Sequence, residues 1–205
     1  MPLTLDEGRR AVALARETLE AHVRGLPVPK GPPDSGVLRE KRGVFVTLST
    51  EQGGARALRG CIGYPEPIRQ LGQAIREVTV YASEDPRFPS PVAAHELGSI
   101  VVEVSVLTVP RDVSAPARRD LPPRIRVGVD GLVVSNRYAS GLLLPQVATE
   151  QGWDRETFLS EACAKAGLSM DAWLDEGTRV QVFQAEIFAE TSPGGRVVRR
   201  LDQAT

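Results

Sequence analysis

Apolar positions near the start of the chain recur with the period of a helix. Thr4, followed three residues later by Glu7, has the form of a capping box, which begins a helix. Gly25 and Pro27 end this helix, and the four prolines of residues 26–36 predict an extended surface connector. The residues that form one apolar stripe at three- and four-residue steps are Val12, Ala15, Leu19 and Val23.

The following segments are rich in β-branched and apolar residues, as strands are. Residues 43–50 predict a first strand, residues 51–55 a glycine-containing hairpin turn, and residues 56–62 the return strand. Residues 99–109 carry the strongest strand signal, because valine and isoleucine alternate along one face. The other face is mixed and includes Glu103. This pattern predicts a sheet that is covered on one side and partly open on the other.

A second helix is predicted between these strands. Pro67 suits its first turn, and the three prolines of residues 83–91 end it. The residues on its apolar face are Ile68, Leu71, Ile75, Val78 and Ala82.

The second half of the chain again predicts strands followed by a helix. Residues 127–134 predict a hairpin with Asp130 and Gly131 at the turn. Residues 140–145 are apolar and closed by proline, a helix begins after Asp154, and residues 179–190 predict a last strand.

This order of elements predicts an α+β fold with an antiparallel sheet and flanking helices, since hairpins dominate and no βαβ alternation repeats. The recurrence of strands followed by a helix indicates a duplicated arrangement. We expect a single domain over residues 1–190 and a disordered tail over residues 191–205, which is rich in glycine and arginine at its start.

Composition narrows the function classes. The 205 residues include 25 Lys and Arg and 26 Asp and Glu, a formal charge of −1, which argues against a dedicated nucleic-acid binder. The chain has no apolar run long enough to span a membrane and no secretory signal at its start, so we expect a cytoplasmic protein. The two cysteines and the distant His22 and His95 do not have metal-ligand spacing, and we predict neither a metal nor a cofactor.

One segment stands out chemically, the run from Arg59 to Gly63. Gly60 and Gly63 flank Cys61 and allow another group to approach the backbone closely. One interpretation is a nucleophilic or substrate-gripping cysteine, with Arg59 stabilising a thiolate. The other is a small buried hydrophobic residue in a strand, with glycines at a bulge.

Three further residues are candidates for the same site. The rigid loop after the second helix could place Asp85 or Arg87 in a cleft with Cys61, although a local ion pair at a helix end is the simpler interpretation. Gln146, after the apolar run at 140–145, is a candidate polar group from the opposite side. Cys163 lies between alanines in a predicted helix and is expected to be ordinary packing.

An ordered series of motifs resembles the AMMECR family, named for the Alport, midface-hypoplasia and elliptocytosis chromosomal region. It covers the chain from about residue 5 to 190, and Asp130-Gly131 resembles the prokaryotic branch. The segments that carry the resemblance are Leu58–Gly63, Asp85-x-Arg87-Phe88 with Pro91, Glu96-Leu97, Glu103–Leu107, Gly128–Leu132, Gly141–Ala148 with Trp153, and Lys165–Leu168.

The resemblance implies an α+β fold with one antiparallel sheet, a duplicated arrangement, and a small helical lobe at about residues 66–95. It places the cysteine motif near a cleft between the lobes. It implies association with a Memo-type protein and a radical-SAM enzyme, and a role in modifying RNA or a small molecule, but no settled reaction.

Two functions therefore stay open, and a third, direct RNA binding, is weaker because the formal charge is −1. The first is an enzyme or enzyme component with Cys61 as catalytic residue. The second is a non-catalytic adaptor or a module that binds a substrate or partner. The substrate-binding candidates are Arg59, Gly60, Gly63, Asp85, Arg87 and Gln146.

Overall fold

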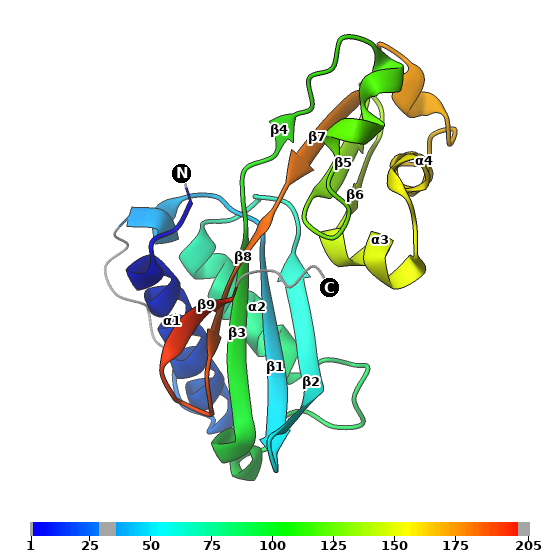
Figure 1. Cartoon of the computed structure of the whole chain (residues 1–205). Coiled ribbons are helices and arrows are strands. Elements are labelled where there is room, and N and C mark those ends of the chain that lie inside the picture. Colours follow the sequence, from blue (N-terminus) through cyan, green and yellow to red (C-terminus); the bar gives the residue numbers. More distant parts are fainter. Residues whose placement is uncertain (1, 29–35, 201–205) are drawn as a thin grey trace. The chain divides into compact units, whose positions relative to one another are not determined.

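The computed structural model describes residues 2–28 and 36–200, so most of the predicted connector at 26–36 and the last five residues lie outside the described chain (Figure 1). The chain divides into two compact units. The first runs to Leu107 and includes a return segment from Glu186, and the second comprises Thr108–Ala185. Both consist of an antiparallel sheet flanked by helices, which confirms the α+β class.

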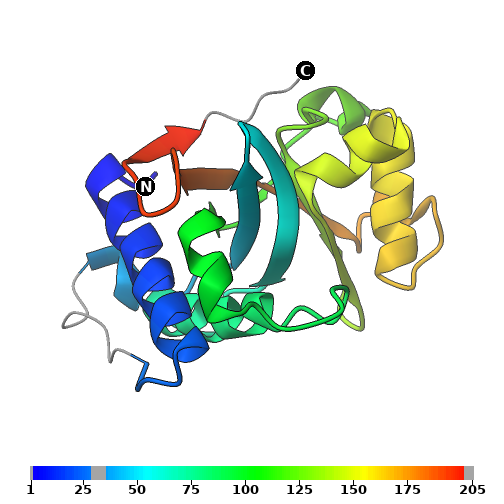
Figure 2. The same ribbon diagram turned by 90° about the horizontal axis from the view of Figure 1, so that it is seen from below.

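The first unit has a five-stranded sheet in the order β2-β1-β3-β8-β9. Its strands are β1 (Val44–Gln52), β2 (Ala55–Tyr64), β3 (Ile100–Leu107), β8 (Ala185–Glu190) and β9 (Val197–Arg200). Its helices are α1 (Leu5–Val23) and α2 (Leu71–Ser83). Both helices contribute to one apolar core with the sheet, and α2 contacts β1 and β2 (Figure 2). The predicted capping box forms, because Thr4 and Glu7 bond reciprocally at the start of α1.

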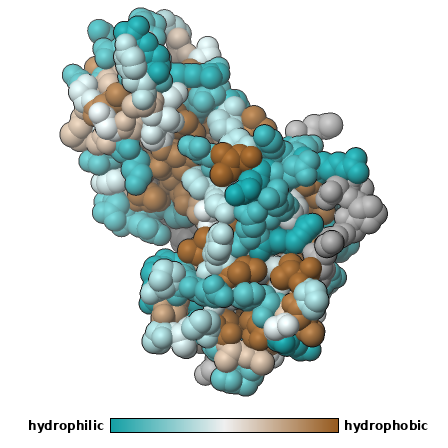
Figure 3. Space-filling model, turned by 180° about the vertical axis from the view of Figure 1, so that it is seen from behind, coloured by the Kyte–Doolittle hydropathy of each residue, from teal (hydrophilic) through white to brown (hydrophobic). Residues whose placement is uncertain are grey.

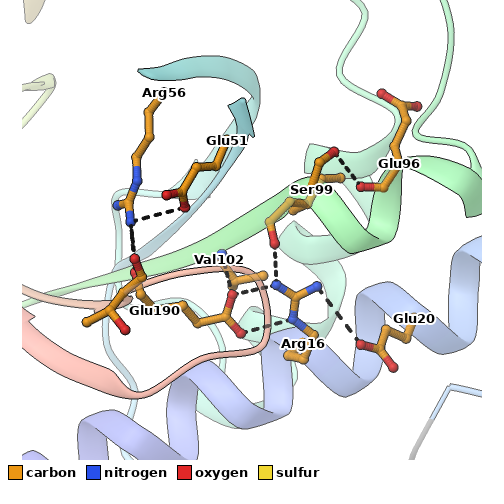
Figure 4. A network of polar contacts seen from close by, with 10 residues as sticks. Arg16, Glu20, Glu51, Arg56, Glu96, Ser99, Val102 and Glu190 are labelled. Atoms are coloured by element: carbon orange, nitrogen blue, oxygen red, sulfur yellow. Dashed lines mark hydrogen bonds and ion pairs between the residues drawn. The ribbon is translucent and has the colours of Figure 1, made fainter. Parts of the chain in front are cut away.

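A buried ion pair ties α1 to the strands of this unit (Figure 4). The Arg16 guanidinium bonds both carboxylate oxygens of Glu190 and donates to the Ile100 carbonyl at 2.6 Å. Glu190 also accepts from the Val102 N–H at 2.9 Å. Because these bonds satisfy groups on α1, β3 and β8 together, they fix the helix on the sheet.

The second unit has a four-stranded sheet in the order β4-β7-β5-β6. Its strands are β4 (Arg111–Asp112), β5 (Gly131–Ser135), β6 (Ser140–Leu143) and β7 (Arg179–Phe183). Its helices are α3 (Pro145–Gln151) and α4 (Arg155–Lys165), and α4 packs on β5 and β6. Phe158, Leu159 and Trp173 belong to its separate apolar core.

The predicted duplication is visible in the connections. In the first unit the hairpin β1–β2 leads through α2 to β3, which pairs with β1. In the second unit the hairpin β5–β6 leads through α3 and α4 to β7, which pairs with β5. Both units therefore repeat a ββαβ pattern with the first strand in the centre.

Several predicted boundaries are wrong. The second helix begins at Leu71 rather than at Pro67, because Gln70 is held in a bridge with Lys41, and Ile68 is 55% exposed. The segment at 66–95 is not a separate lobe, since α2 is part of the core of the first unit.

The segment at 127–134 is not a hairpin. Asp130 is fully buried, and β5 begins only at Gly131 and pairs with β6 instead. The Asp130 carboxylate accepts the Arg126 N–H at 2.9 Å and the Gln184 amide at 2.8 Å. A buried carboxylate that ties its own loop to the distant Gln184 cannot occupy the exposed corner of a hairpin.

The end of the chain also differs from expectation. The single strand predicted at 179–190 is two strands in two sheets, separated at Gln184. Within the predicted tail, Val197–Arg200 forms β9 and pairs antiparallel with β8. A glycine-containing turn precedes β9, with Thr191 donating to the Arg196 carbonyl at 2.9 Å. That turn makes the return strand possible.

Candidate functional site

Cys61 lies in β2, the edge strand of the first sheet, directly opposite Thr47 on β1. Its neighbour Gly60 is buried toward α2, so alternation along the strand turns the Cys61 side chain to the other face. The thiol is half-buried, and the Thr47 hydroxyl donates to Sγ at 3.4 Å. A thiol and a hydroxyl thus meet on the face of the sheet that points away from α2.

The backbone of Cys61 is held at both of its polar groups. The Cys61 N–H donates to Asp85 Oδ2 at 2.9 Å, and the Cys61 carbonyl accepts from Arg87 Nη2 at 2.8 Å. Both residues follow the end of α2, so this loop closes the exposed edge of β2. Edge strands need such cover because their outward N–H and C=O groups lack a neighbouring strand.

The two loop residues form an ion pair with one buried partner. Arg87 bonds the Asp85 carboxylate with Nε at 3.0 Å and with Nη2 at 2.5 Å, and the Asp85 side chain is fully buried while that of Arg87 is 57% exposed. The Arg87 hydrogen bonds hold the pKa of Asp85 well below its usual range, against the opposing effect of burial. The pKa of Arg87 is raised, first by Asp85 and to a smaller extent by the Cys61 side chain.

The two glycines are required by close packing. A Cβ on Gly60 would lie 2.0 Å from the Ala82 carbonyl oxygen of α2, and one on Gly63 would lie 2.3 Å from the Phe45 ring. Neither glycine has a positive φ, so close approach is the reason for their presence. Their role is to let α2 and Phe45 contact β2.

The Arg59 guanidinium binds groups other than the Cys61 thiol. A register shift separates the pairs Leu48–Gly60 and Ser49–Leu58, which leaves Arg59 as the extra residue of a β-bulge. Its Nε donates to Glu96 at 2.7 Å and its Nη2 to the Ser90 carbonyl at 3.1 Å. These bonds tie the segment that precedes β3 to β2, so the idea that Arg59 stabilises a thiolate is wrong.

The structure adds residues that the sequence analysis missed. Thr47 faces Cys61 on one side and Glu103 of β3 on the other in the register of the sheet. Glu103 is paired with Arg200 of β9 at 3.2 Å. Thr47 is an ordinary strand residue by composition, and only strand register could identify it.

The remaining candidates lie elsewhere. Gln146 is an exposed residue of α3 in the second unit and is not brought into one unit with Cys61. His22 hydrogen-bonds Glu84 at 2.8 Å, and His95 is exposed. The expected seam between α2 and the sheet is filled by fully buried Leu71 and Ile75, and the thiol faces the other side. No group of His, Cys, Asp and Glu within residues 2–28 and 36–200 could hold a metal.

Comparisons with known proteins identify the family. A sequence profile described as AMMECR1 matches residues 12–188. The chain belongs to the AMMECR1 family. It is 53% identical over 193 residues to a protein of Methanothermobacter thermautotrophicus, covering 92% of this chain and 97% of the relative. It is 50% identical over 198 residues to protein PF1979 of Pyrococcus furiosus, covering 94% and 92%.

A solved AMMECR1-like structure supports the same fold. The uncharacterized protein PH0010 of Pyrococcus horikoshii is 47% identical, with a TM-score of 0.72 over 94% of this chain and 96% of that one. These archaeal relatives fit the prokaryotic branch of the AMMECR1 family. In the described part of the chain, no helix is long and apolar enough to cross a membrane.

Proposed function

We propose that this AMMECR1-family protein acts through the Cys61 thiol, as an enzyme or as the cysteine-bearing component of one. The hydrogen bond from the Thr47 hydroxyl to Cys61 Sγ carries the proposal. It places a polar donor on the sulfur in a strand whose backbone is fixed by Asp85 and Arg87. Nucleophilic cysteines need this combination of a fixed position and donors that stabilise negative charge on sulfur.

The second thiol of the chain is a natural reference. Cys163 of α4 is fully buried, and burial raises the pKa of its thiol. Cys61 is half-buried and lies beside the Thr47 hydroxyl, and its backbone carbonyl accepts a hydrogen bond from the Arg87 guanidinium. We therefore expect the two thiols to differ strongly in reactivity.

Alkylation with iodoacetamide, followed by intact-mass measurement, tests this expectation. Cys61 should react at neutral pH at least about tenfold faster than Cys163, and Cys61→Ser should remove the fast phase. Thr47→Val should slow the fast phase about threefold or more, the loss expected for one hydrogen bond, whereas Thr47→Ser should preserve it. Equal and slow labelling of both thiols in the wild type would exclude a reactive Cys61.

A non-catalytic binding module is the second candidate. It is favoured because Asp85 and Arg87 bind the edge of β2 and His22 binds Glu84. In the described part of the chain, none of these side chains hydrogen-bonds the Cys61 thiol as a general base would. An unchanged labelling rate in Thr47→Val would favour this alternative, because exposure alone would then explain the reactivity.

The family resemblance supports a Memo-type protein and a radical-SAM enzyme as partners in modifying RNA or a small molecule, and the formal charge of −1 favours the small molecule. Both cysteines are free, which fits a reducing compartment such as the cytoplasm. Copurification of a tagged chain with each partner, in wild type and in Cys61→Ser, tests whether the association exists and whether it needs the thiol.

A further inference from the structure

The second unit contains an open pocket of about 580 Å³ that is remote in sequence from the cysteine motif. The surface of the molecule carries hydrophobic residues in patches between hydrophilic ones (Figure 3). The lining of this pocket combines apolar side chains with charged ones. Its volume is within the range of small-molecule sites, roughly 300–1,000 Å³. The residues that line it are Arg119, Pro122, Pro123, Val127, Trp153, Asp154, Arg155 and Glu156.

The apolar residues of the pocket lining are held by α3 and by the core of the second unit. Trp153 follows the end of α3, where its N–H donates to the Ala148 carbonyl at 2.9 Å, and it packs against the core of the second unit together with Val127. Pro122, which is buried, and Pro123 also line the pocket. A half-buried indole beside two prolines offers a flat apolar surface with few rotatable bonds, which suits a planar ring.

The two arginines of the pocket lining have no protein partner. Within residues 2–28 and 36–200, neither Arg119 nor Arg155 forms an ion pair or a side-chain hydrogen bond. The lining also has two carboxylates, so its formal charges cancel. Asp154 is committed, however, because its Oδ1 accepts the Thr157 N–H at 2.8 Å as the cap of α4, and Glu156 lies in the first turn, where the helix dipole favours its charge.

We propose that this pocket binds a small molecule with a planar aromatic ring and an anionic phosphate or carboxylate group. The ring lies against Trp153 and the prolines, and the anion accepts hydrogen bonds from the Arg119 and Arg155 guanidinium groups. Planar guanidinium groups suit both kinds of anion, because each presents paired oxygens to the fork of N–H donors. This proposal uses no residue of the cysteine motif and does not rest on the function proposed for Cys61.

Tryptophan fluorescence of the full chain tests the proposal, since the chain has only two tryptophans and Trp173 is buried in the core. The probes are adenosine 5′-monophosphate and adenosine 5′-carboxylate, which share one ring and differ in the anion, with adenosine as the neutral control. At least one anionic probe should quench in a saturable manner with a Kd below about 1 mM, and adenosine should bind at least about tenfold more weakly. The stronger of the two probes identifies phosphate or carboxylate as the preferred anion.

Variants locate the binding. Arg119→Gln with Arg155→Gln should weaken the anionic probe at least about tenfold, and Trp153→Phe should remove the quenching. Arg137→Gln is the matched control, because Arg137 is an exposed arginine of the same unit that stacks on Tyr138 outside the pocket. Absence of saturable quenching by both probes, equal binding of adenosine, or unchanged affinity in the double arginine variant would each overturn the proposal.

Discussion

The two units share the same order of strands and helices, but the side chains on their sheets differ in chemistry. In each, a glycine of the outer hairpin strand lies under the end of the crossing helix. A Cβ would lie 2.0 Å from the Ala82 carbonyl oxygen at Gly60, and 2.4 Å from the Ala166 nitrogen at Gly141. These equivalent close approaches show that both helices pack directly on backbone.

The residue after each of these glycines differs between the two units, so the shared fold does not determine its type. Cys61 faces Thr47 across the hairpin of the first unit, whereas Leu142 faces Val133 at the corresponding place in the second. All four side chains are half-buried. The repeated architecture therefore accepts an ordinary apolar pair here, and we expect that the thiol–hydroxyl pair of the first unit is not required for folding. This difference supports the function proposed for Cys61.

The largest loss of stability is expected when the close approach of helix and strand, which both units share, is removed. Gly60→Ala and Gly141→Ala should each lower the free energy of unfolding by about 3 kcal/mol, at the upper end for overpacking, because a backbone atom of the helix has to move. Urea unfolding measures the loss. Gly98→Ala and Gly177→Ala are controls in the two units, since open space surrounds each and neither has a positive φ. If the free energy of unfolding falls no more than in the controls, the helices can shift to accept a Cβ at little cost, which would contradict the prediction.

A smaller effect is expected at the buried aspartates, one in each unit. Asp85→Ala and Asp130→Ala should each cost about 2 kcal/mol, since each leaves backbone or amide donors without an acceptor. Asp112→Ala is the surface control, because both partners of the Asp112–Arg179 pair are 59% exposed, and it should cost less than about 1 kcal/mol.

The same aspartates predict a pH dependence. The Arg87 hydrogen bonds lower the pKa of Asp85, and hydrogen bonds from Arg126 and Gln184 lower the pKa of Asp130 despite the large opposing effect of burial. A carboxyl whose folded pKa is below its unfolded value, about 3.9, stabilises the fold above that value and loses this contribution as pH falls toward the folded pKa. Urea midpoints between pH 7 and pH 3 should therefore fall less steeply in either Ala variant than in the wild type. Parallel curves would contradict the assignment.

The smallest change in the free energy of unfolding is expected when the first unit receives the apolar pair of the second unit. Thr47→Val with Cys61→Val places an apolar pair where the second unit already has one, so the free energy of unfolding should change by less than about 1 kcal/mol. Fast alkylation should disappear in the same variant. A loss above 2 kcal/mol in urea unfolding would indicate instead that the first unit needs this pair to fold.

Local patterns predicted much of the fold, because short-range physics decides it. The capping box at Thr4 and the apolar stripe predicted α1. Composition and the turn between them indicated β1 and β2, and alternation indicated β3. Chain segments that depend on distant partners were misjudged. The pattern predicts a turn at Asp130, but its carboxylate is buried and bonds Gln184, 54 positions away. It predicts a disordered tail, but β9 within that tail pairs with β8.

The candidate site likewise has features that local sequence patterns predict and features that depend on distant partners. The sequence alone identified Cys61, its glycines, and the Asp85–Arg87 loop, since glycines beside a cysteine and a charged pair between prolines are local features. It determined the α+β class and the family resemblance for the same reason. Only the tertiary structure decided what Cys61 faces. From the turn at Gln52–Ala55, continuous pairing would put Cys61 opposite Val46, and the bulge at Arg59 shifts it by one residue to Thr47. A one-residue shift exchanges the faces of a strand, and its energy depends on the packing of α2 over Gly60 and of Glu96 on Arg59, which no local pattern contains.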